Sequence, residues 1–296
     1  MLICEIAFKS RIPESLQTEI DIEVKTVNPS RLTFVTTMRI ASECKHHTPS
    51  FVMTHTIADT MAAISARELN STRDNTIPYP IFLFLSDNAE TVKSIPTEVA
   101  KKADAIVFES ENGRKKWESI KNFDKIKKFE VVAFPVKKTD ISHHLNDITT
   151  LGYVGPIGEG TTLRQFFDKI SSSGLTDKLK IIVTGTGKAR YVMPIVKGCR
   201  ANKLNVEWLG ETYDEASVAM QLDGFVRSGE TFADSEKNLL ANGVPCVTAN
   251  NVTDLFDNEL RIELSKKSEK IYLEQFTPEM FKEKVTKLLE AVKCST

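Results

Sequence analysis

The stretch DGFVRSGETFADSEKNLLANGVPCVTAN, residues 223–250 of the 296, decides the fold of the second half of the chain. Its apolar start DGFV is typical of a short buried strand, and a helix is predicted from about Asp234. Gly243, Val244 and Pro245 end that helix, and PCVTA begins another strand. A strand, a crossover helix and a second strand predict a parallel sheet with helices on its faces.

Further strands of buried type precede this unit, namely ITTLGYVG, KLKIIVTG and NVEWLG. The helix TTLRQFFDKIS between the first two has apolar residues at i, i+3, i+4 and i+7, which gives it one apolar face. We therefore expect a doubly wound α/β domain over residues 149–276. Thr277 and Pro278 suit the N-cap and first turn of a last helix within residues 277–296. That helix either stays on this domain or crosses back to the preceding one.

The first half alternates in the same way. Strands are predicted at MLICEIAF, IDIEVKTV, RLTFVTT, FVMTHT, IPYPIFLFL, DAIVFES and FEVVAFPV, with helices such as IADTMAAISAREL and RKKWESIK between them. A second Rossmann-like, doubly wound domain is expected over residues 1–148, followed by a linker in the polar segment KKTDISHHLNDITT. Twelve of the 13 glycines lie at or after Gly152, so the two domains differ in what they demand of the backbone.

Composition excludes several classes of protein. Lys+Arg 39 against Asp+Glu 40 gives a net charge of -1, so binding of nucleic acid through bulk charge is not expected. No apolar stretch approaches the roughly 20 residues that span a bilayer, and the first residues lack the pattern of a signal peptide. Five cysteines without a C-x-x-C pair argue against a disulfide framework and a zinc site. A cytoplasmic protein is expected.

A glycine-containing turn follows the first strand of the second domain. Residues 155–160, GPIGEG, lead into a helix that opens with Thr161 and Thr162. Glycines let a ligand approach the backbone, and the N–H groups of a helix N-terminus favour an anion such as phosphate. Glycine also serves simply to make such turns. The segment is therefore a candidate phosphate site, with the structural explanation left open.

The next turn, TGTGKAR at residues 184–190, offers Gly185 and Gly187 but fits neither common nucleotide motif. Arg190 stands where a dinucleotide fingerprint needs its third Gly or Ala, and Ala189 stands where a P-loop needs Ser or Thr. Neither a nicotinamide enzyme nor a P-loop ATPase is supported.

Among the histidines and a run of acidic residues, one residue is a candidate for the functional site. Histidine pairs at 46–47 and 143–144 lie on polar segments without metal-ligand spacing. His55 follows the apolar run FVMT, at the strand end where α/β sheets place ligands, so it is a candidate site residue. The acids Glu19, Asp21 and Glu23 alternate with apolar residues, which indicates the solvated face of a strand better than a metal-nucleotide motif. No metal site is expected.

Four of these segments in order, GYVGPIGEG, IIVTGTG, NVEWLG and the stretch at 223–250, resemble the donor domain of retaining family-4-type glycosyltransferases of the GT-B fold. The resemblance covers nearly all of residues 151–250 and, more weakly, 52–136. It implies two Rossmann-like domains facing across a cleft, with the nucleotide-sugar donor on the second. In that family a Glu, seven-residue spacer, Glu pattern holds the donor. The first position matches Glu230, beside the sugar, and the second matches Asn238, at the ribose.

The chain departs from the family where the family binds diphosphate. Pro156 stands where the family has Arg, Glu159 where it has Lys, and Ala233 where it has a glycine. Two lost charge-assisted hydrogen bonds would remove about 3–6 kcal/mol of donor binding. Other cations could substitute, and Lys188, Arg190, Arg164 and Arg227 are available.

The resemblance implies a glycosyltransferase that moves a sugar from an activated donor, a nucleotide diphosphate sugar, to an acceptor hydroxyl on a glycan, lipid or small molecule. The transfer would proceed with retention and without a metal or other cofactor. Glu230 and His55 are the expected catalytic residues. The expected donor-binding residues are Gly155, Gly158, Gly160, Thr161, Gly185, Lys188, Arg190, Ser228, Thr231, Phe232 and Asn238.

Two alternatives remain. The first is a catalytically degenerate GT-B protein that binds a glycan or a partner glycosyltransferase, because the Arg, the Lys, the second Glu and the glycine loop after the first strand are all missing. The second is a nucleotide-sugar epimerase or related enzyme on the same fold. The oligomeric state, the sugar and the base are not specified by the sequence.

Overall fold

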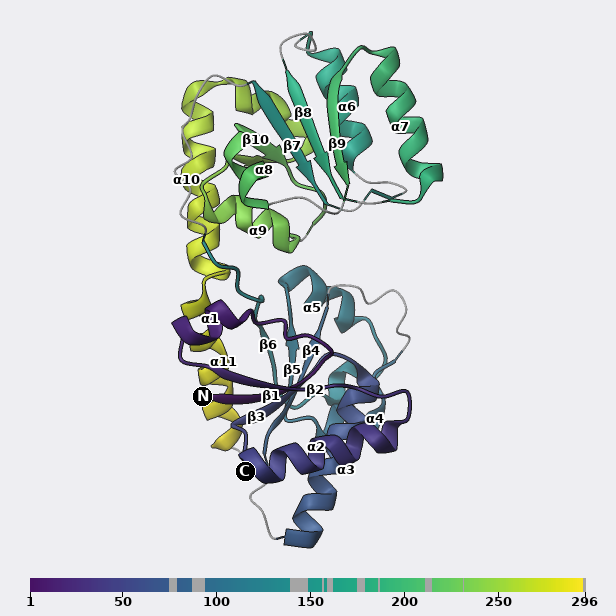
Figure 1. Cartoon of the computed structure of the whole chain (residues 1–296), viewed down its shortest axis with the longest axis vertical. Coiled ribbons are helices and arrows are strands. Elements are labelled where there is room, and N and C mark those ends of the chain that lie inside the picture. Colours follow the sequence, from purple (N-terminus) through teal and green to yellow (C-terminus); the bar gives the residue numbers. More distant parts are fainter. Residues whose placement is uncertain are drawn as a thin grey trace. The chain divides into compact units, whose positions relative to one another are not determined.

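A computed structural model describes residues 1–74, 79–86, 94–138, 149–155, 157–158, 162–174, 179–185, 187–210, 215–230 and 232–294. The chain divides into two compact units (Figure 1). Unit 1 comprises Met1–Pro135 and Pro278–Thr296, and unit 2 comprises Val136–Thr277. Each unit contains one parallel sheet with helices packed on it.

The sheet of unit 1 has the strand order β2-β1-β3-β4-β5-β6. Its strands are β1 (Leu2–Ile6), β2 (Glu23–Val27), β3 (Phe51–Thr54), β4 (Ile81–Leu85), β5 (Ala105–Phe108) and β6 (Phe129–Val131). Its helices are α1 (Glu14–Glu19), α2 (Thr33–His47), α3 (Ile57–Asp74), α4 (Thr97–Lys102), α5 (Glu111–Glu118), the 3-10 helix η2 (Phe123–Lys125) and α11 (Pro278–Lys293).

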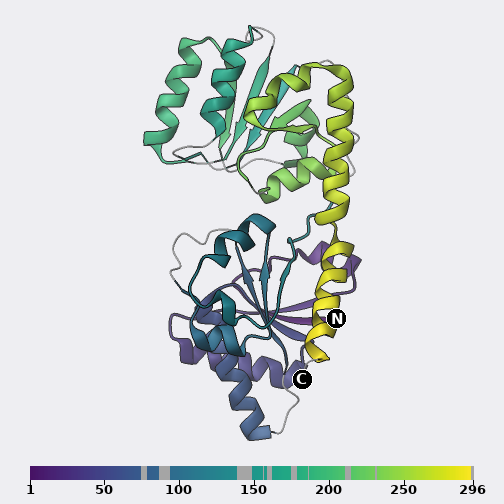
Figure 2. The same cartoon turned by 180° about the vertical axis from the view of Figure 1, so that it is seen from behind.

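Two apolar layers cover the two faces of this sheet. One layer joins α2, α3, α4 and α5 to residues such as Ile81 and Leu83. The other joins α1 and α11 to Ile3, Phe51 and Phe82. The C-terminal helix α11 therefore belongs to unit 1, where its apolar stripe from Phe281 to Val292 is buried, and it runs beside the strands of that unit in Figure 2.

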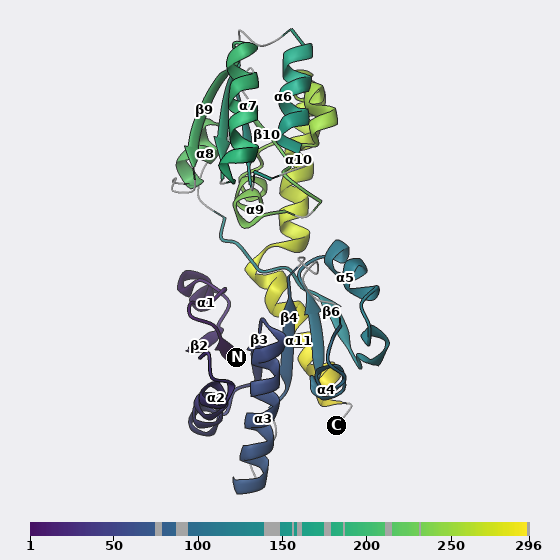
Figure 3. The same cartoon turned by 90° about the vertical axis from the view of Figure 1, so that its right-hand side faces the viewer.

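The sheet of unit 2 has the order β11-β10-β7-β8-β9. Its strands are β7 (Thr150–Val154), β8 (Lys180–Thr184), β9 (Asn205–Gly210), β10 (Gly224–Val226) and β11 (Cys246–Val247). Its helices are α6 (Thr162–Ser172), α7 (Ala189–Ala201), α8 (Glu215–Gln221), α9 (Asp234–Ala241), the 3-10 helix η4 (Ala249–Phe256) and α10 (Asn258–Gln275). Helices α6 and α7 lie next to each other (Figures 1 and 3) and share an apolar layer with η4 and α10. The strand order reverses at β7, between β8 and β10, and ligands bind at such switch points in open α/β sheets.

A predicted strand in unit 1 forms a helix instead. The segment RLTFVTT is not a strand, because α2 begins at Thr33. Its β-branched residues favour a strand locally, but Ile40, Ala41 and Cys44 repeat at helical spacing and are buried against the sheet, so packing overrides propensity.

The acids of the alternating run do not share a strand face. Glu19 ends α1, Asp21 lies in a turn with φ 52°, and Glu23 begins β2. All three are exposed, as predicted, while Ile20 and Ile22 between them are buried. The alternation therefore reflects a helix end and a turn packed on the core, which a period of two residues cannot distinguish from a strand.

Candidate functional site

The turns after β7, β8 and β10 meet at the switch point of unit 2. A Cβ on Gly155 would lie 2.4 Å from Ser228 Oγ, and one on Gly185 would lie 2.0 Å from the carbonyl oxygen of Gly155. Both glycines have positive φ, 151° and 114°, which other residues rarely adopt. Glycine is therefore needed at both positions to let the three turns pack together.

Two further contacts fix these turns. Ile157 and Gly187 form a parallel bridge between the turns after β7 and β8. The hydroxyl of Thr162, the first residue of α6, donates to the carbonyl oxygens of Arg227 and Ser228 at 3.1 and 3.2 Å. The N-terminus of α6 is thereby held against the end of β10, where its free N–H groups favour an anion.

A buried carboxyl group closes the loop after β10. Glu236, fully buried in α9, accepts hydrogen bonds from the backbone N–H of Ser228 at 2.6 Å and of Ala233 at 2.9 Å. Burial raises the pKa of Glu236 to about 7, and the two backbone donors and Arg227 only partly oppose this. Glu236 was not among the predicted site residues. Its place three residues after the N-cap Ala233, as in a capping box, was the signal available.

The predicted donor residues on this loop lie in different surroundings. Ser228 is half-buried and faces Gly155, whereas Glu230 is exposed on the loop. The ring of Phe232 lies under the guanidinium of Arg227, 4.2 Å from Cζ to the ring centroid, and meets Phe276 edge-on at 6.0 Å. Asn238 is half-buried in α9, where its backbone carbonyl oxygen accepts a hydrogen bond from the side-chain amide of Asn242.

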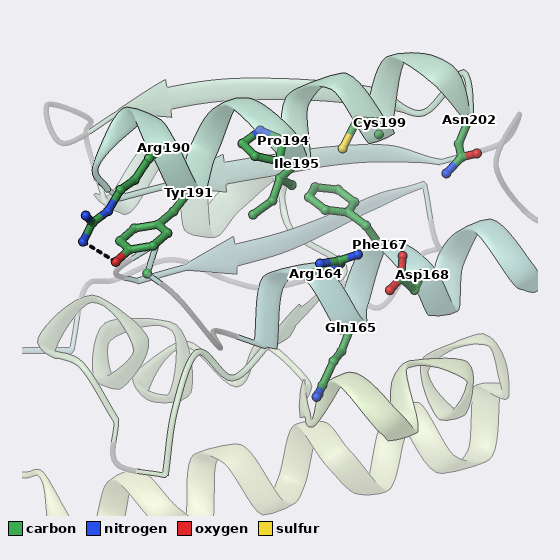
Figure 4. Close-up of a pocket in the computed structure, with 12 residues that line it drawn as sticks. Arg164, Gln165, Phe167, Asp168, Arg190, Tyr191, Pro194, Ile195, Cys199 and Asn202 are labelled. Atoms are coloured by element: carbon green, nitrogen blue, oxygen red, sulfur yellow. Dashed lines mark hydrogen bonds between the residues drawn. The ribbon is translucent and has the colours of Figure 1, made fainter.

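Three of the four candidate cations, Arg164, Lys188 and Arg190, lie in α6 or at the start of α7. Lys188 is the exposed N-cap residue of α7. A cavity of about 510 Å³ between α6 and α7 is lined by Gly158, Arg164 and Arg190 among others (Figure 4). Arg190 donates to the hydroxyl of Tyr191 at 2.5 Å and stacks over its ring (Figure 4). The structure thus brings two predicted cations and one predicted glycine to one cavity.

Some predicted residues lie outside the described part of the chain. These are Gly160, Thr161 and Thr231 among the donor-binding residues, Pro156 and Glu159 among the departures, and the histidine pair at 143–144.

His55 lies in unit 1, after β3. Its Nε2 is 2.7 Å from Oε1 of Glu5, a fully buried residue of β1 that also accepts from Ser10 Oγ at 2.6 Å and from the backbone N–H of Arg11 at 3.2 Å. Within the described residues, Nδ1 of His55 is buried without a hydrogen-bond partner. The loop after β1 is therefore held against Glu5 by hydrogen bonds, and Nε2 of His55 is hydrogen-bonded to the same carboxylate.

Arg11 completes this cluster. Its guanidinium pairs with Glu109 after β5 and lies 4.1 Å from the ring centroid of Phe134. Glu5 lies near the end of β1, and His55 and Glu109 directly follow β3 and β5, so the three side chains lie at the carboxyl edge of the sheet.

In the described residues, no three His, Cys, Asp or Glu side chains gather as metal ligands would. Over the same part of the chain, no helix has the length and apolar character that crossing a bilayer requires.

No protein-family model matches the sequence, and no curated protein does. In fold, the chain is similar to solved glycosyltransferases. A glycosyltransferase from Rickettsia africae superposes with a TM-score of 0.70 at 11% identity, over 100% of this chain and 99% of that one. The lipopolysaccharide outer core galactosyltransferase WaaB gives 0.62 at 15% identity, over 98% and 99%. HepE from Anabaena, solved with UDP and glucose, gives 0.66 at 13% identity, over 98% and 91%. The predicted fold is confirmed: two Rossmann-like α/β units with the GT-B fold of these proteins.

Proposed function

We propose that the protein is a glycosyltransferase that transfers a sugar from a nucleotide diphosphate donor to an acceptor hydroxyl. The observation that carries this proposal is the convergence of the turns after β7, β8 and β10 with the N-terminus of α6. Backbone N–H groups at such a point stabilise a departing diphosphate, which is the main requirement of glycosyl transfer from these donors. The shared fold with glycosyltransferases, including one solved with UDP, supports the same assignment.

Within this proposal, the diphosphate lies against the turns that contain Gly155, Gly158 and Gly185, and Lys188 and Arg190 supply positive charge in place of the family's Arg and Lys. Arg190 can leave Tyr191, because Arg190 is exposed and a single hydrogen bond at the surface contributes little free energy. Glu230 orients hydroxyls of the donor sugar and Asn238 the ribose. The anomeric configuration is retained, and no metal is required.

The test is incubation of the purified chain with uridine, guanosine, adenosine and cytidine diphosphate sugars, followed by measurement of nucleoside diphosphate release with and without acceptor extracts. One donor should be consumed, and NMR of the product should show the donor's anomeric configuration. Inversion would refute the retaining mechanism while leaving the transferase assignment intact. Absence of turnover with every donor, together with absence of nucleotide binding, would refute the assignment.

A second function is favoured by a specific observation in unit 1. Nε2 of His55 is hydrogen-bonded to the carboxylate of Glu5, and Ser10 and Arg11 in the loop after β1 donate to the same carboxylate. This arrangement suits a catalytically degenerate protein that serves as a glycan-binding or partner subunit of another glycosyltransferase. A degenerate protein of this kind should co-purify with a stable partner and should not consume a donor. An enzyme should consume its donor without any partner protein.

A further inference from the structure

Unit 2 contains a second cavity, of about 210 Å³, on the β11 side of β10. The turns after β7 and β8 lie beyond the opposite edge of β10, so the cavity adjoins the proposed donor site and shares with it only the turn after β10, which carries Arg227 and Phe232. Its walls come from the ends of β10 and β11, from η4 and from α10. Its polar lining includes Arg227, Thr248, Asn251, Asp254, Lys267 and Ser268.

Two polar atoms in the wall lack hydrogen-bond partners among the described residues. Ser268 is 1% exposed, and its buried Oγ makes no hydrogen bond. The buried Nε of Arg227 has no partner either. Leaving a buried polar group unsatisfied is costly, so two such groups around one cavity indicate that water or a bound polar ligand occupies it.

The charges around the cavity favour an anion. Arg227 and Lys267 are its cations, and neither forms an ion pair with a described residue. Asp254 is the one acid among the lining residues, and it accepts a hydrogen bond from Asn251 at 3.3 Å, while Thr248 donates to Asn251 at 3.3 Å. Asp254 keeps its negative charge and Arg227 also faces the buried Glu236, so the described lining residues carry two positive charges and one negative charge, which still favours an anion.

The geometry holds the guanidinium in place for this purpose. Arg227 follows β10 directly, and its Cζ lies 4.2 Å from the centroid of the Phe232 ring, a cation–π contact that restrains the guanidinium. A fixed guanidinium recognises phosphate and carboxylate oxygens better than a mobile one, because less side-chain entropy is lost on binding.

We propose that this cavity binds a small monophosphate, either inorganic phosphate or the phosphate group of a small metabolite. A tetrahedral phosphate presents its oxygens in several directions and can accept from Arg227, Lys267 and Ser268 on different walls, whereas the two oxygens of a carboxylate lie in one plane. The volume equals that of about seven water molecules, which accommodates a phosphate with a short organic group and excludes a nucleotide sugar. The site lies beyond the proposed function and does not depend on it.

The test is isothermal titration of the full chain with inorganic phosphate, with acetate as the carboxylate probe. Lys267→Gln and Ser268→Ala remove two donors, and Lys266→Gln is the matched control, because Lys266 is exposed like Lys267 but does not line the cavity. Phosphate should bind wild type and the control alike, and each cavity variant should bind about tenfold more weakly. Acetate should bind more weakly than phosphate. Ribose 5-phosphate binding more tightly than inorganic phosphate would identify the organic ester as the ligand.

The proposal is overturned if wild type does not bind phosphate at about 10 mM, or if both cavity variants bind it as wild type does. The second result would place the anion elsewhere, for example at the proposed diphosphate site. The proposed function is tested separately, because UDP binding should be unchanged in Lys267→Gln and Ser268→Ala. If the wild-type chain binds phosphate but not UDP, the proposed function fails and the phosphate site stands. If it binds UDP but not phosphate, the phosphate site fails and the proposed function stands.

Discussion

The backbone N–H of Ser228 donates a 2.6 Å hydrogen bond to the buried carboxyl group of Glu236, eight residues later in the chain. The bond closes the loop that carries Glu230. It also ties the shape of this loop to a group whose pKa, about 7, lies near neutrality. Stability and loop order should therefore depend on pH in a defined direction.

Glu236 binds its proton more tightly in the folded chain than in the unfolded chain, where the pKa is near 4.5. The stabilisation is complete below about pH 4.5 and is lost as pH rises through about 7, by at most about 3 kcal/mol. Urea unfolding between about pH 5 and about pH 8 should show this loss in wild type and not in Glu236→Gln. Glu259→Gln, at an exposed acid of the same unit, should follow wild type. Parallel profiles for wild type and Glu236→Gln would contradict the assignment.

Gly185→Ala should destabilise unit 2 and weaken nucleotide binding. The new Cβ would lie 2.0 Å from the carbonyl oxygen of Gly155 at a φ of 114°, so the turns after β7 and β8 must separate, at a cost of about 1–3 kcal/mol. Gly198→Ala is the matched control. It has no atom within 4 Å of the new Cβ and lies inside α7, where alanine should stabilise by about 0.5–1 kcal/mol. The unfolding temperature should fall in Gly185→Ala and rise in Gly198→Ala. Equal shifts in the two variants would refute the close approach of Gly185 to Gly155.

Ser268→Ala should stabilise the protein in phosphate-free buffer by about 1 kcal/mol, because it removes a buried hydroxyl without a partner. In saturating phosphate the gain should disappear, since wild type then gains the ligand's stabilisation. A loss of stability in phosphate-free buffer would mean that the hydroxyl is already satisfied.

Glu5 and His55 should be energetically coupled. A double-mutant cycle with Glu5→Gln and His55→Phe should give a coupling of about 1–3 kcal/mol in equilibrium unfolding, because the pair is buried on the Glu5 side and joined at 2.7 Å. Arg67 and Asp104, a half-buried pair in the same unit, provide a comparison cycle. Additive effects at Glu5 and His55 would show that the imidazole does not stabilise the carboxylate.

Much of the fold could be predicted from local patterns. Buried strands such as Phe51–Thr54 and the apolar stripe of α6 are visible in the sequence because a period or a continuous apolar run marks them. The turn glycines Gly155 and Gly185 could be located for the same reason, since each directly follows a strand.

The remainder depends on contacts between distant residues. The segment at 33–37 forms a helix because the following residues of the same helix pack on the sheet. A window of seven residues does not include those contacts. Glu5 and His55 meet across 50 residues, and Glu236 becomes a buried, nearly neutral acid only when α9 covers the end of β10. Their residue types could be seen in the sequence, but their burial could not.

Nucleotide binding by the switch point of unit 2 is the central claim, and calorimetry with UDP, GDP, ADP and CDP tests it most directly. One of the four should bind saturably at micromolar to millimolar concentration, and Gly185→Ala and Lys188→Gln should each weaken it about tenfold or more. Glu263→Ala, at an exposed acid of α10, should bind as wild type does. If none of the four nucleotides binds at millimolar concentration to the folded wild-type chain, the proposed donor site is wrong.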